Sequence, residues 1–196
     1  TTIARAVGCA LRGAVAVPHA VEADGQIITV FDPGLHAPIE SSDAPSKRLF
    51  REDAAGGEDK RWLRCRAPFG VVAGELRVED LDLLHHQTQG IHEAPIQMKA
   101  NGGMLLIDDL GRQRDRARDL LDRFIYPMEA GADVLTLMGG KKIEVPFRMI
   151  LFYSTNLDPM RLLDDEAFFR RLQYKIEMRA PNEEEFGRIF RLAAEA

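Results

Sequence analysis

A run of four apolar residues that ends in two carboxylates, MLLIDD at 104–109, constrains the fold of this chain more than any other feature. Met104 to Ile107 offer no polar position, so neither face of a strand formed by them suits contact with water. Such runs are typical of strands in a parallel sheet that helices cover on both sides. Met149 to Tyr153 repeat the pattern and end in Ser154-Thr155-Asn156. The two runs predict buried strands of an α/β layer fold.

Patterns on either side of these runs predict the other elements. Apolar residues at helical spacing predict helices over 3–14, 76–84, 120–128 and 164–172, and a final helix that starts at a capping box of Asn182 and Glu185. In the first helix, the expected buried stripe comprises Ile3, Ala6, Val7, Ala10, Leu11 and Ala14. Pro127 is expected to distort or end its helix.

Strands are predicted where short apolar or alternating segments border turn residues. They lie at 15–17, at 21–31 around an Asp24-Gly25 hairpin turn, at 134–145 around a glycine turn, and at 174–178. Residues 32–60, with their prolines and Gly56-Gly57, are predicted to be an irregular surface segment.

The composition narrows the classes of function. With 26 basic and 31 acidic side chains, the net charge is −5, which repels phosphate backbones, so nucleic acid is possible as a partner at a local patch but is not favoured. The apolar runs are far shorter than the roughly 20 residues that span a bilayer, so no membrane insertion is predicted. Cys9 and Cys65 are too few for a disulfide framework, and the expected compartment is the cytoplasm.

Three histidines, His85, His86 and His92, fall within eight positions and invite a metal-site interpretation. Carboxylates and thiols at ligand spacing are missing, however, and adjacent side chains on a helix or strand point apart. We therefore favour solvated or packing histidines over a metal site.

Polar side chains follow both predicted buried strands, at the end where ligands bind in sheets of this kind. Asp108 is suited to hold Mg²⁺ or its waters, and Asp109 to orient a water that attacks a terminal phosphate. The alternative is that the two aspartates start a turn or cap a helix. Asn156 offers an amide to a phosphate or a water, or else forms an Asx turn.

Arg170 and Arg171 on the following helix offer guanidinium groups to the charge that develops on a transferring phosphate. On their own, such arginines more often belong to a solvated helix face. Lys141 and Lys142, at the glycine turn of the 134–145 hairpin, are more often solvated turn residues than contacts to a protein or nucleic-acid partner.

Together these features resemble the AAA+ ATPases over nearly the whole chain. The segment GIHEAPIQMKANGGMLLIDDL is similar to the Walker B region of the MoxR-like and enhancer-binding members, VLTLMGGKKIEV to the hairpin before sensor 1, and MILFYSTN to the sensor 1 strand. By position, the resemblance makes Asp108 the magnesium-associated Walker B aspartate, Asp109 the catalytic acid and Asn156 sensor 1. Arg171 is the better match to the arginine finger, with Arg170 as its competitor.

The resemblance implies a three-layer P-loop NTPase-type parallel sheet with inserted β-hairpins and the start of a C-terminal helical lid. Residues 1–179 would be the core and 180–196 the first lid helix. The opening TTIARAVGCAL looks like the segment after a Walker A Gly-Lys, so Thr1 would be the hydroxyl that binds Mg²⁺ and Thr2 its neighbour at the nucleotide. No Walker A loop occurs in the chain, so the expectation is weak nucleotide binding by this fragment alone.

The implied activity is Mg²⁺-dependent ATP hydrolysis that remodels a protein partner or complex. A finger that acts in trans implies a homo-oligomeric ring, a hexamer, with a protein substrate or adaptor. Asp109 stands where the family usually has Glu, and its carboxylate is retracted by roughly 1 to 1.5 Å. The alternative is therefore a non-hydrolysing nucleotide-sensing or scaffold subunit. A phosphoacceptor receiver domain is disfavoured, because its paired acids would lie near the first strand.

Overall fold

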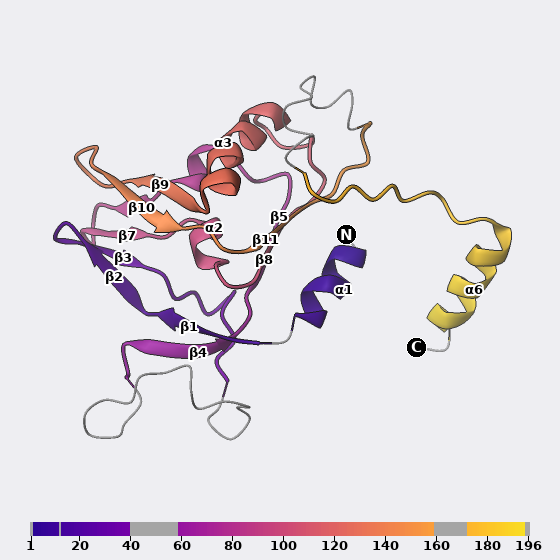
Figure 1. Ribbon diagram of the computed structural model, residues 1–196, viewed down its shortest axis with the longest axis horizontal. Coiled ribbons are helices and arrows are strands. Elements are labelled where there is room, and N and C mark those ends of the chain that lie inside the picture. Colours follow the sequence, from indigo (N-terminus) through magenta and orange to yellow (C-terminus); the bar gives the residue numbers. More distant parts are fainter. Residues whose placement is uncertain (1, 12, 40–58, 159–171, 195–196) are drawn as a thin grey trace.

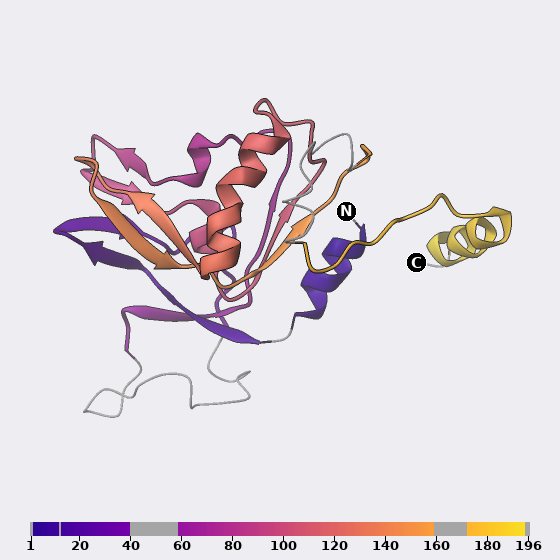
Figure 2. The ribbon, with the colours of Figure 1, turned by 45° about the horizontal axis from the view of Figure 1, so that its top comes forward.

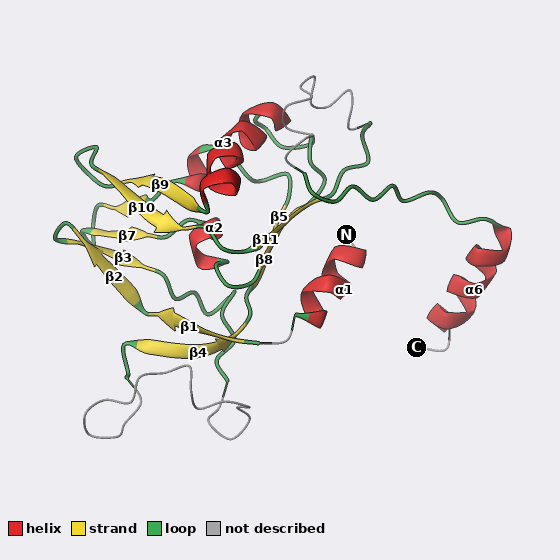
Figure 3. Ribbon diagram, in the orientation of Figure 1, coloured by secondary structure: helices red, strands yellow, loops and turns green. Residues whose placement is uncertain are grey.

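A computed structural model describes residues 2–11, 13–39, 59–158 and 172–194. Figure 1 shows strands gathered at one end of the molecule, with a single C-terminal helix set apart from them. The helices and the 3-10 turn are α1 (Thr2–Ala10), η3 (Glu79–Leu81), α2 (Ile96–Lys99), α3 (Ala117–Ala130) and α6 (Glu183–Ala194). The strands, coloured yellow in Figure 3, are β1 (Ala14–Pro18), β2 (Ala20–Ala23), β3 (Gln26–Thr29), β4 (Trp62–Arg66), β5 (Phe69–Val72), β6 (Leu84–His86), β7 (Ile91–Glu93), β8 (Met104–Ile107), β9 (Ala132–Thr136), β10 (Lys142–Pro146) and β11 (Ile150–Tyr153).

The two apolar runs form neighbouring parallel strands, as part of a sheet of order β11-β8-β5. All four residues of β8 are fully buried. Leu105 and Ile107 pack with α3 in one apolar cluster, while Met104 and Leu106 pack with Ala4 of α1 in another. Helices therefore cover both faces of the sheet, which confirms the predicted layered α/β fold with a parallel sheet.

α1 forms where it is predicted but turns a different face inward. Ala4 and Gly8 are buried, whereas Ile3 and Val7 of the expected stripe are 43% and 37% exposed. A Cβ on Gly8 would lie 2.9 Å from the ring of Phe69 on β5. The helix packs on its smallest residues because they allow this close approach, so the predicted stripe is wrong.

α3 continues to Ala130, so of the two outcomes predicted for Pro127, distorting or ending the helix, the second does not occur. Pro127 lies in the last turn, and its carbonyl accepts a hydrogen bond from Gly131 N at 3.0 Å. Gly131, at φ 67°, adopts the left-handed conformation that commonly closes a helix.

Both predicted hairpins are confirmed. Asp24 and Gly25, with φ values of 53° and 75°, form the turn between β2 and β3; positive φ at both positions is typical of the tight turn that matches strand twist. β9 and β10 pair antiparallel around the second glycine turn. The first hairpin joins a sheet of order β2-β3-β7-β6, and β1 pairs with β4.

Two further predictions are wrong. The segment 76–84 forms only the turn η3 and the start of β6 instead of a helix. Tyr174, Ile176 and Met178 form no strand and are 86%, 70% and 67% exposed. The capping box is confirmed: Asn182 N donates to Glu185 Oε2 and Glu185 N to Asn182 Oδ1, both at 2.9 Å. The helix predicted at 164–172 falls almost entirely outside the described residues.

Figure 2 shows α1 beside the parallel sheet and α6 away from it. Within the part of the chain that the structure describes, no helix has the length and apolar character needed to cross a membrane.

Candidate functional site

The carboxyl ends of β5, β8 and β11 meet at one edge of the parallel sheet, and the backbone pairing continues beyond the strands. Asp108 N donates to Val72 O at 2.8 Å, and Ser154 N donates to Ile107 O at 3.0 Å. Leu110 N then donates to Ser154 O at 2.8 Å. Backbone hydrogen bonds therefore join the segments after β8 and β11 to their neighbours beyond the ends of the strands.

Asp108 and Asp109 each accept a hydrogen bond from a side chain that follows β11. Ser154 Oγ donates to Asp108 Oδ1 at 2.5 Å, and Asn156 Nδ2 donates to Asp109 Oδ1 at 3.0 Å. Both donors are neutral, so they orient the carboxylates without cancelling their charge. The structure thus brings together Asp108, Asp109 and Asn156, three of the residues predicted for the site.

Asp109 has an unusual backbone. Its φ is 49°, in the left-handed region that costs a non-glycine residue on the order of 1 kcal/mol. Neighbouring bonds hold this conformation: Arg112 N donates to Asp109 O at 3.0 Å, and Thr155 Oγ1 donates to Leu110 O at 2.8 Å. Residues in such conformations cluster at functional sites, where the surrounding structure fixes the direction of a side chain.

Two residues of this edge carry no predicted role. Ser154 is one, although a signal existed: Tyr153 pairs with Ile107 in the parallel register, so the next residues along, Ser154 and Asp108, are neighbours. Gln113 is the other. It is 8% exposed and bonds to the loop that carries Asp109, and no sequence pattern marks it.

The donor atoms at this edge fit Mg²⁺. They are carboxylate, hydroxyl and amide oxygens, which hard cations prefer, and sulfur and imidazole are absent from the four side chains. No group of three or more His, Cys, Asp or Glu residues able to hold a metal occurs among the described residues. A small number of protein carboxylates is the usual arrangement for Mg²⁺ that is also bound by substrate phosphates.

The remaining predicted site residues lie elsewhere or outside the description. Thr2 is the exposed first residue of α1, and α1 begins on the side of the sheet at which β11 ends (Figure 2). Thr1, Arg170 and Arg171 lie outside the described residues, so their roles stay predictions.

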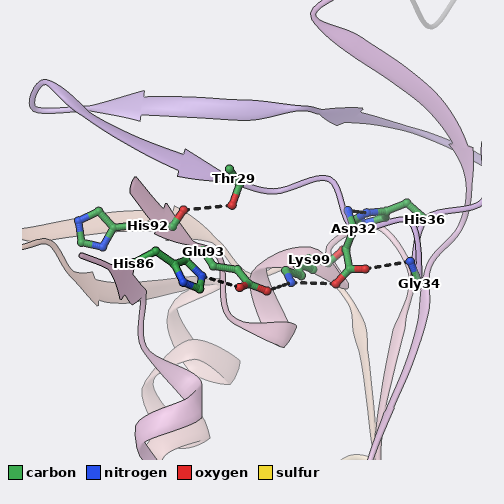
Figure 4. Close-up of polar contacts among 8 residues, drawn as sticks. All are labelled: Thr29, Asp32, Gly34, His36, His86, His92, Glu93 and Lys99. Atoms are coloured by element: carbon green, nitrogen blue, oxygen red, sulfur yellow. Dashed lines mark hydrogen bonds and ion pairs between the residues drawn. The ribbon is translucent and has the colours of Figure 1, made fainter. Parts of the chain in front are cut away.

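A second polar cluster surrounds Lys99, the last residue of α2 (Figure 4). The Lys99 side chain is 9% exposed, and its Nζ lies 2.8 Å from Asp32 Oδ2 and 2.7 Å from Glu93 Oε1. His86 Nε2 lies 2.9 Å from Glu93 Oε2, and Gly34 N donates to Asp32 Oδ1 at 2.9 Å. The cluster joins a loop, β6, β7 and α2, and its charges satisfy one another, so we interpret it as structural.

The cluster shifts the pKa of its members. The hydrogen bond from Lys99 is the largest cause that lowers the pKa of Asp32 and that of Glu93. Burial acts to lower the pKa of Lys99, but the hydrogen bonds to both carboxylates raise it above its ordinary value. All three groups are therefore held in their charged forms at neutral pH.

His85, His86 and His92 pack against other side chains or form hydrogen bonds within the fold. His92 is 2% exposed, its ring lies 4.9 Å from that of His85, and its Nε2 is 2.7 Å from Gln26 Oε1. Burial is the main cause that lowers the pKa of His92. His86 pairs with Glu93 instead, on the opposite side of β6 from His85.

The two hairpin lysines bond within the fold. Lys141 Nζ lies 2.5 Å from Asp24 Oδ1 at the tip of the other hairpin, and Lys142 Nζ donates to Thr136 Oγ1. Gln26 bonds to both backbone groups of Met138, at 3.1 and 3.2 Å. These contacts join the tip of the β2–β3 hairpin to that of the β9–β10 hairpin, at the same end of the molecule (Figure 1).

No family model and no curated protein matches the chain. Among solved structures it is similar to NtrX from Brucella abortus, with 18% identity and a TM-score of 0.43 over 54% of this chain. A structure of the same protein in complex with ADP gives 17% identity and a TM-score of 0.40 over 56% of this chain. The matched region is only 24% of each NtrX chain.

Proposed function

We propose that the edge formed by the ends of β8 and β11 binds a magnesium nucleotide, and that the chain is the core of an ATPase of the AAA+ type. One observation carries the proposal: two consecutive carboxylates on one strand end are each held by a neutral donor from the neighbouring strand end. In parallel sheets covered by helices, ligands bind outside the carboxyl ends of the strands. The AAA+ assignment rests on the sequence resemblance.

Each residue has a distinct role in this proposal. Asp108, oriented by Ser154, holds Mg²⁺ or its waters; when bound, the ion neutralises charge on the phosphates. Asp109 orients the attacking water and accepts its proton as the terminal phosphate is transferred. Asn156 fixes the Asp109 carboxylate and has an amide oxygen with which to bind the same water.

Wider aspects of the proposal follow the resemblance. The protein would belong with the MoxR-like and enhancer-binding members and act in the cytoplasm as a homo-oligomeric ring that remodels a protein partner. Residues 1–179 would be its core and 180–196 the start of its lid. Thr1 and Thr2 would contact the nucleotide and its Mg²⁺, and Arg171 or Arg170 would reach the nucleotide of a neighbouring subunit.

Magnesium-dependent ATP binding and turnover, measured on the full-length protein, test the proposal. We expect the full-length protein to bind Mg-ATP and hydrolyse it, and Asp108→Asn to weaken the Mg²⁺ dependence of both. Absence of Mg²⁺-dependent nucleotide binding would contradict the proposal. Binding without turnover, also at concentrations at which rings form, would instead establish the nucleotide-sensing alternative.

The arginine finger has its own test. In the full-length protein, Arg171→Ala should preserve ATP binding and remove hydrolysis, because the guanidinium stabilises charge that develops only during phosphoryl transfer. Arg170→Ala is the matched control on the adjacent residue. Retained hydrolysis in Arg171→Ala, with loss in Arg170→Ala, would assign the finger to Arg170.

A further inference from the structure

Gln113 occupies the centre of the loop that follows β8. Its side chain is 8% exposed and donates to the backbone carbonyls of Asp108 and Asp109. Asp109 is the residue proposed to orient the attacking water. We infer that Gln113 is a positioning residue, which fixes the backbone of Asp109 and thereby aims its carboxylate at the nucleotide. The inference rests on the proposed function and adds to it a residue that touches neither carboxylate in the described contacts.

The hydrogen bonds of Gln113 define one orientation of its amide. Oε1 accepts from Gly111 N at 2.8 Å. Nε2 faces three carbonyl oxygens, those of Asp108 at 3.1 Å, Ala73 at 3.3 Å and Asp109 at 3.4 Å. The reverse orientation would set an oxygen against three oxygens and a donor against a donor, so it is excluded.

The carbonyls bonded to the Gln113 amide explain how it can fix the direction of the Asp109 carboxylate without touching it. The carbonyls of Asp108 and Asp109 stand on either side of the Asp109 Cα, so holding both limits rotation about its φ and ψ bonds. Those rotations set the direction of the Asp109 side chain. The third carbonyl, that of Ala73, ties the loop to the end of β5.

The backbone of Asp109 needs such a restraint. Its φ of 49° is unfavourable for a residue with a Cβ and persists only where the surroundings impose it. Asn156 restrains the carboxylate from the side of β11, at 3.0 Å, and Gln113 restrains the backbone from the loop. Without Gln113, the loop can relax to negative φ and carry the carboxylate away from Asn156.

Three variants of the full-length protein separate this role from general stability. Gln113→Met keeps the size of the side chain and removes every hydrogen bond. Gln113→Glu keeps an acceptor for Gly111 N but cannot donate to the carbonyls. Gln97→Met is the matched control, because Gln97 is also buried and its Nε2 donates to Leu81 O and Asp133 Oδ2, away from the site.

The readouts are the exchange rate of the Gly111 amide, the Kd for Mg-ATP, and kcat. We expect both variants to lose protection of the Gly111 amide, Gln113→Met because it has no acceptor and Gln113→Glu because its second oxygen would face the three carbonyls. Both should lose roughly tenfold to a hundredfold in kcat, the effect of displacing a catalytic group by about 1 Å, with little change in Kd. Gln97→Met should leave Gly111 exchange and kcat unchanged.

An unchanged kcat in folded Gln113→Met would overturn the inference, and so would an equal loss of kcat in Gln97→Met. A wild-type protein that binds no Mg-ATP would overturn the proposed function before any variant is compared. In that case exchange of the Gly111 amide still reports whether Gln113 holds the loop at Gly111.

Discussion

Asp109 shows how a single residue links local strain to a candidate function. Its left-handed backbone at φ 49° is held by bonds to Arg112 and Gln113 and by the Asn156 amide. Aspartate and asparagine tolerate this region better than most residues with a Cβ. A side chain other than Asp, Asn or Gly here should therefore weaken the fold as well as the chemistry.

Substitution of Asp109 tests the two effects separately. Asp109→Asn should leave the free energy of unfolding nearly unchanged, because Asn tolerates positive φ, but should remove ATP turnover, because the amide cannot accept the proton of water. Asp109→Ala should also lower the free energy of unfolding by about 1 kcal/mol. Urea denaturation and steady-state hydrolysis measure these outcomes; turnover retained in Asp109→Asn would exclude Asp109 as the base.

At the scale of elements, the parallel sheet depends on how closely α1 approaches it. α1 packs through Ala4 and Gly8, and the Cβ position of Gly8 falls 2.9 Å from the Phe69 ring. The strand beneath is β8, whose Met104 and Leu106 complete this cluster. The small residues of α1 therefore set the distance between the layers.

Gly8→Val should separate α1 from the sheet. Valine and glycine differ little in helix propensity, so the added side chain acts through its contact with Phe69. We expect the free energy of unfolding to fall by about 1–3 kcal/mol, the usual effect of overpacking. Gly13→Val is the control, because a Cβ at Gly13 meets nothing within 4 Å. Equal effects of both substitutions in thermal melts would contradict this account of the packing.

At the scale of the whole molecule, α2 and its charged cluster connect the two parts of the core. Ile96 of α2 packs against the cluster that contains α3, and Met98 packs against the cluster that contains β3. Lys99 completes the connection through Asp32 and Glu93, which belong to separate segments. Removing Lys99 would leave the partly exposed Asp32 and Glu93 carboxylates without their charge partner and destabilise the fold.

This connection predicts how stability depends on pH. The pKa values of Asp32 and Glu93 lie below their ordinary values of 3.8 and 4.5 in the folded protein. Their contribution is therefore complete above about pH 4.5 and is lost as the pH falls through the lowered values. The raised pKa of Lys99 adds a contribution that is lost only well above pH 10.

Lys99→Met should consequently lower the Tm at pH 7, and the difference from wild type should shrink as the pH falls towards 3. Lys142→Met is the control, because that exposed lysine bonds only to a hydroxyl among the described contacts. A Tm difference for Lys99→Met that stays constant between pH 7 and pH 3 would contradict the assigned role of the cluster.

The sequence alone determined the features that local pattern controls. The apolar runs defined two buried strands, Asp24-Gly25 defined a hairpin, and the Asn182 capping box defined the start of α6. Each depends on residues within one short segment, where periodicity and turn preferences act directly. The same local patterns predict Asp108, Asp109 and Asn156 at strand ends.

Features that depend on contacts between distant segments emerge from the folded structure and not from local pattern. The buried face of α1 follows the shape of Phe69, which overrides the apolar stripe of Ile3 and Val7. Tyr174 to Met178 alternate like a strand but pair with no neighbour among the described segments. The restraint of Asp109 by Gln113 and the charges around Lys99 arise where loops, strands and helices meet. The spacing of residues along the sequence does not predict these contacts, because they depend on how the layers pack against one another.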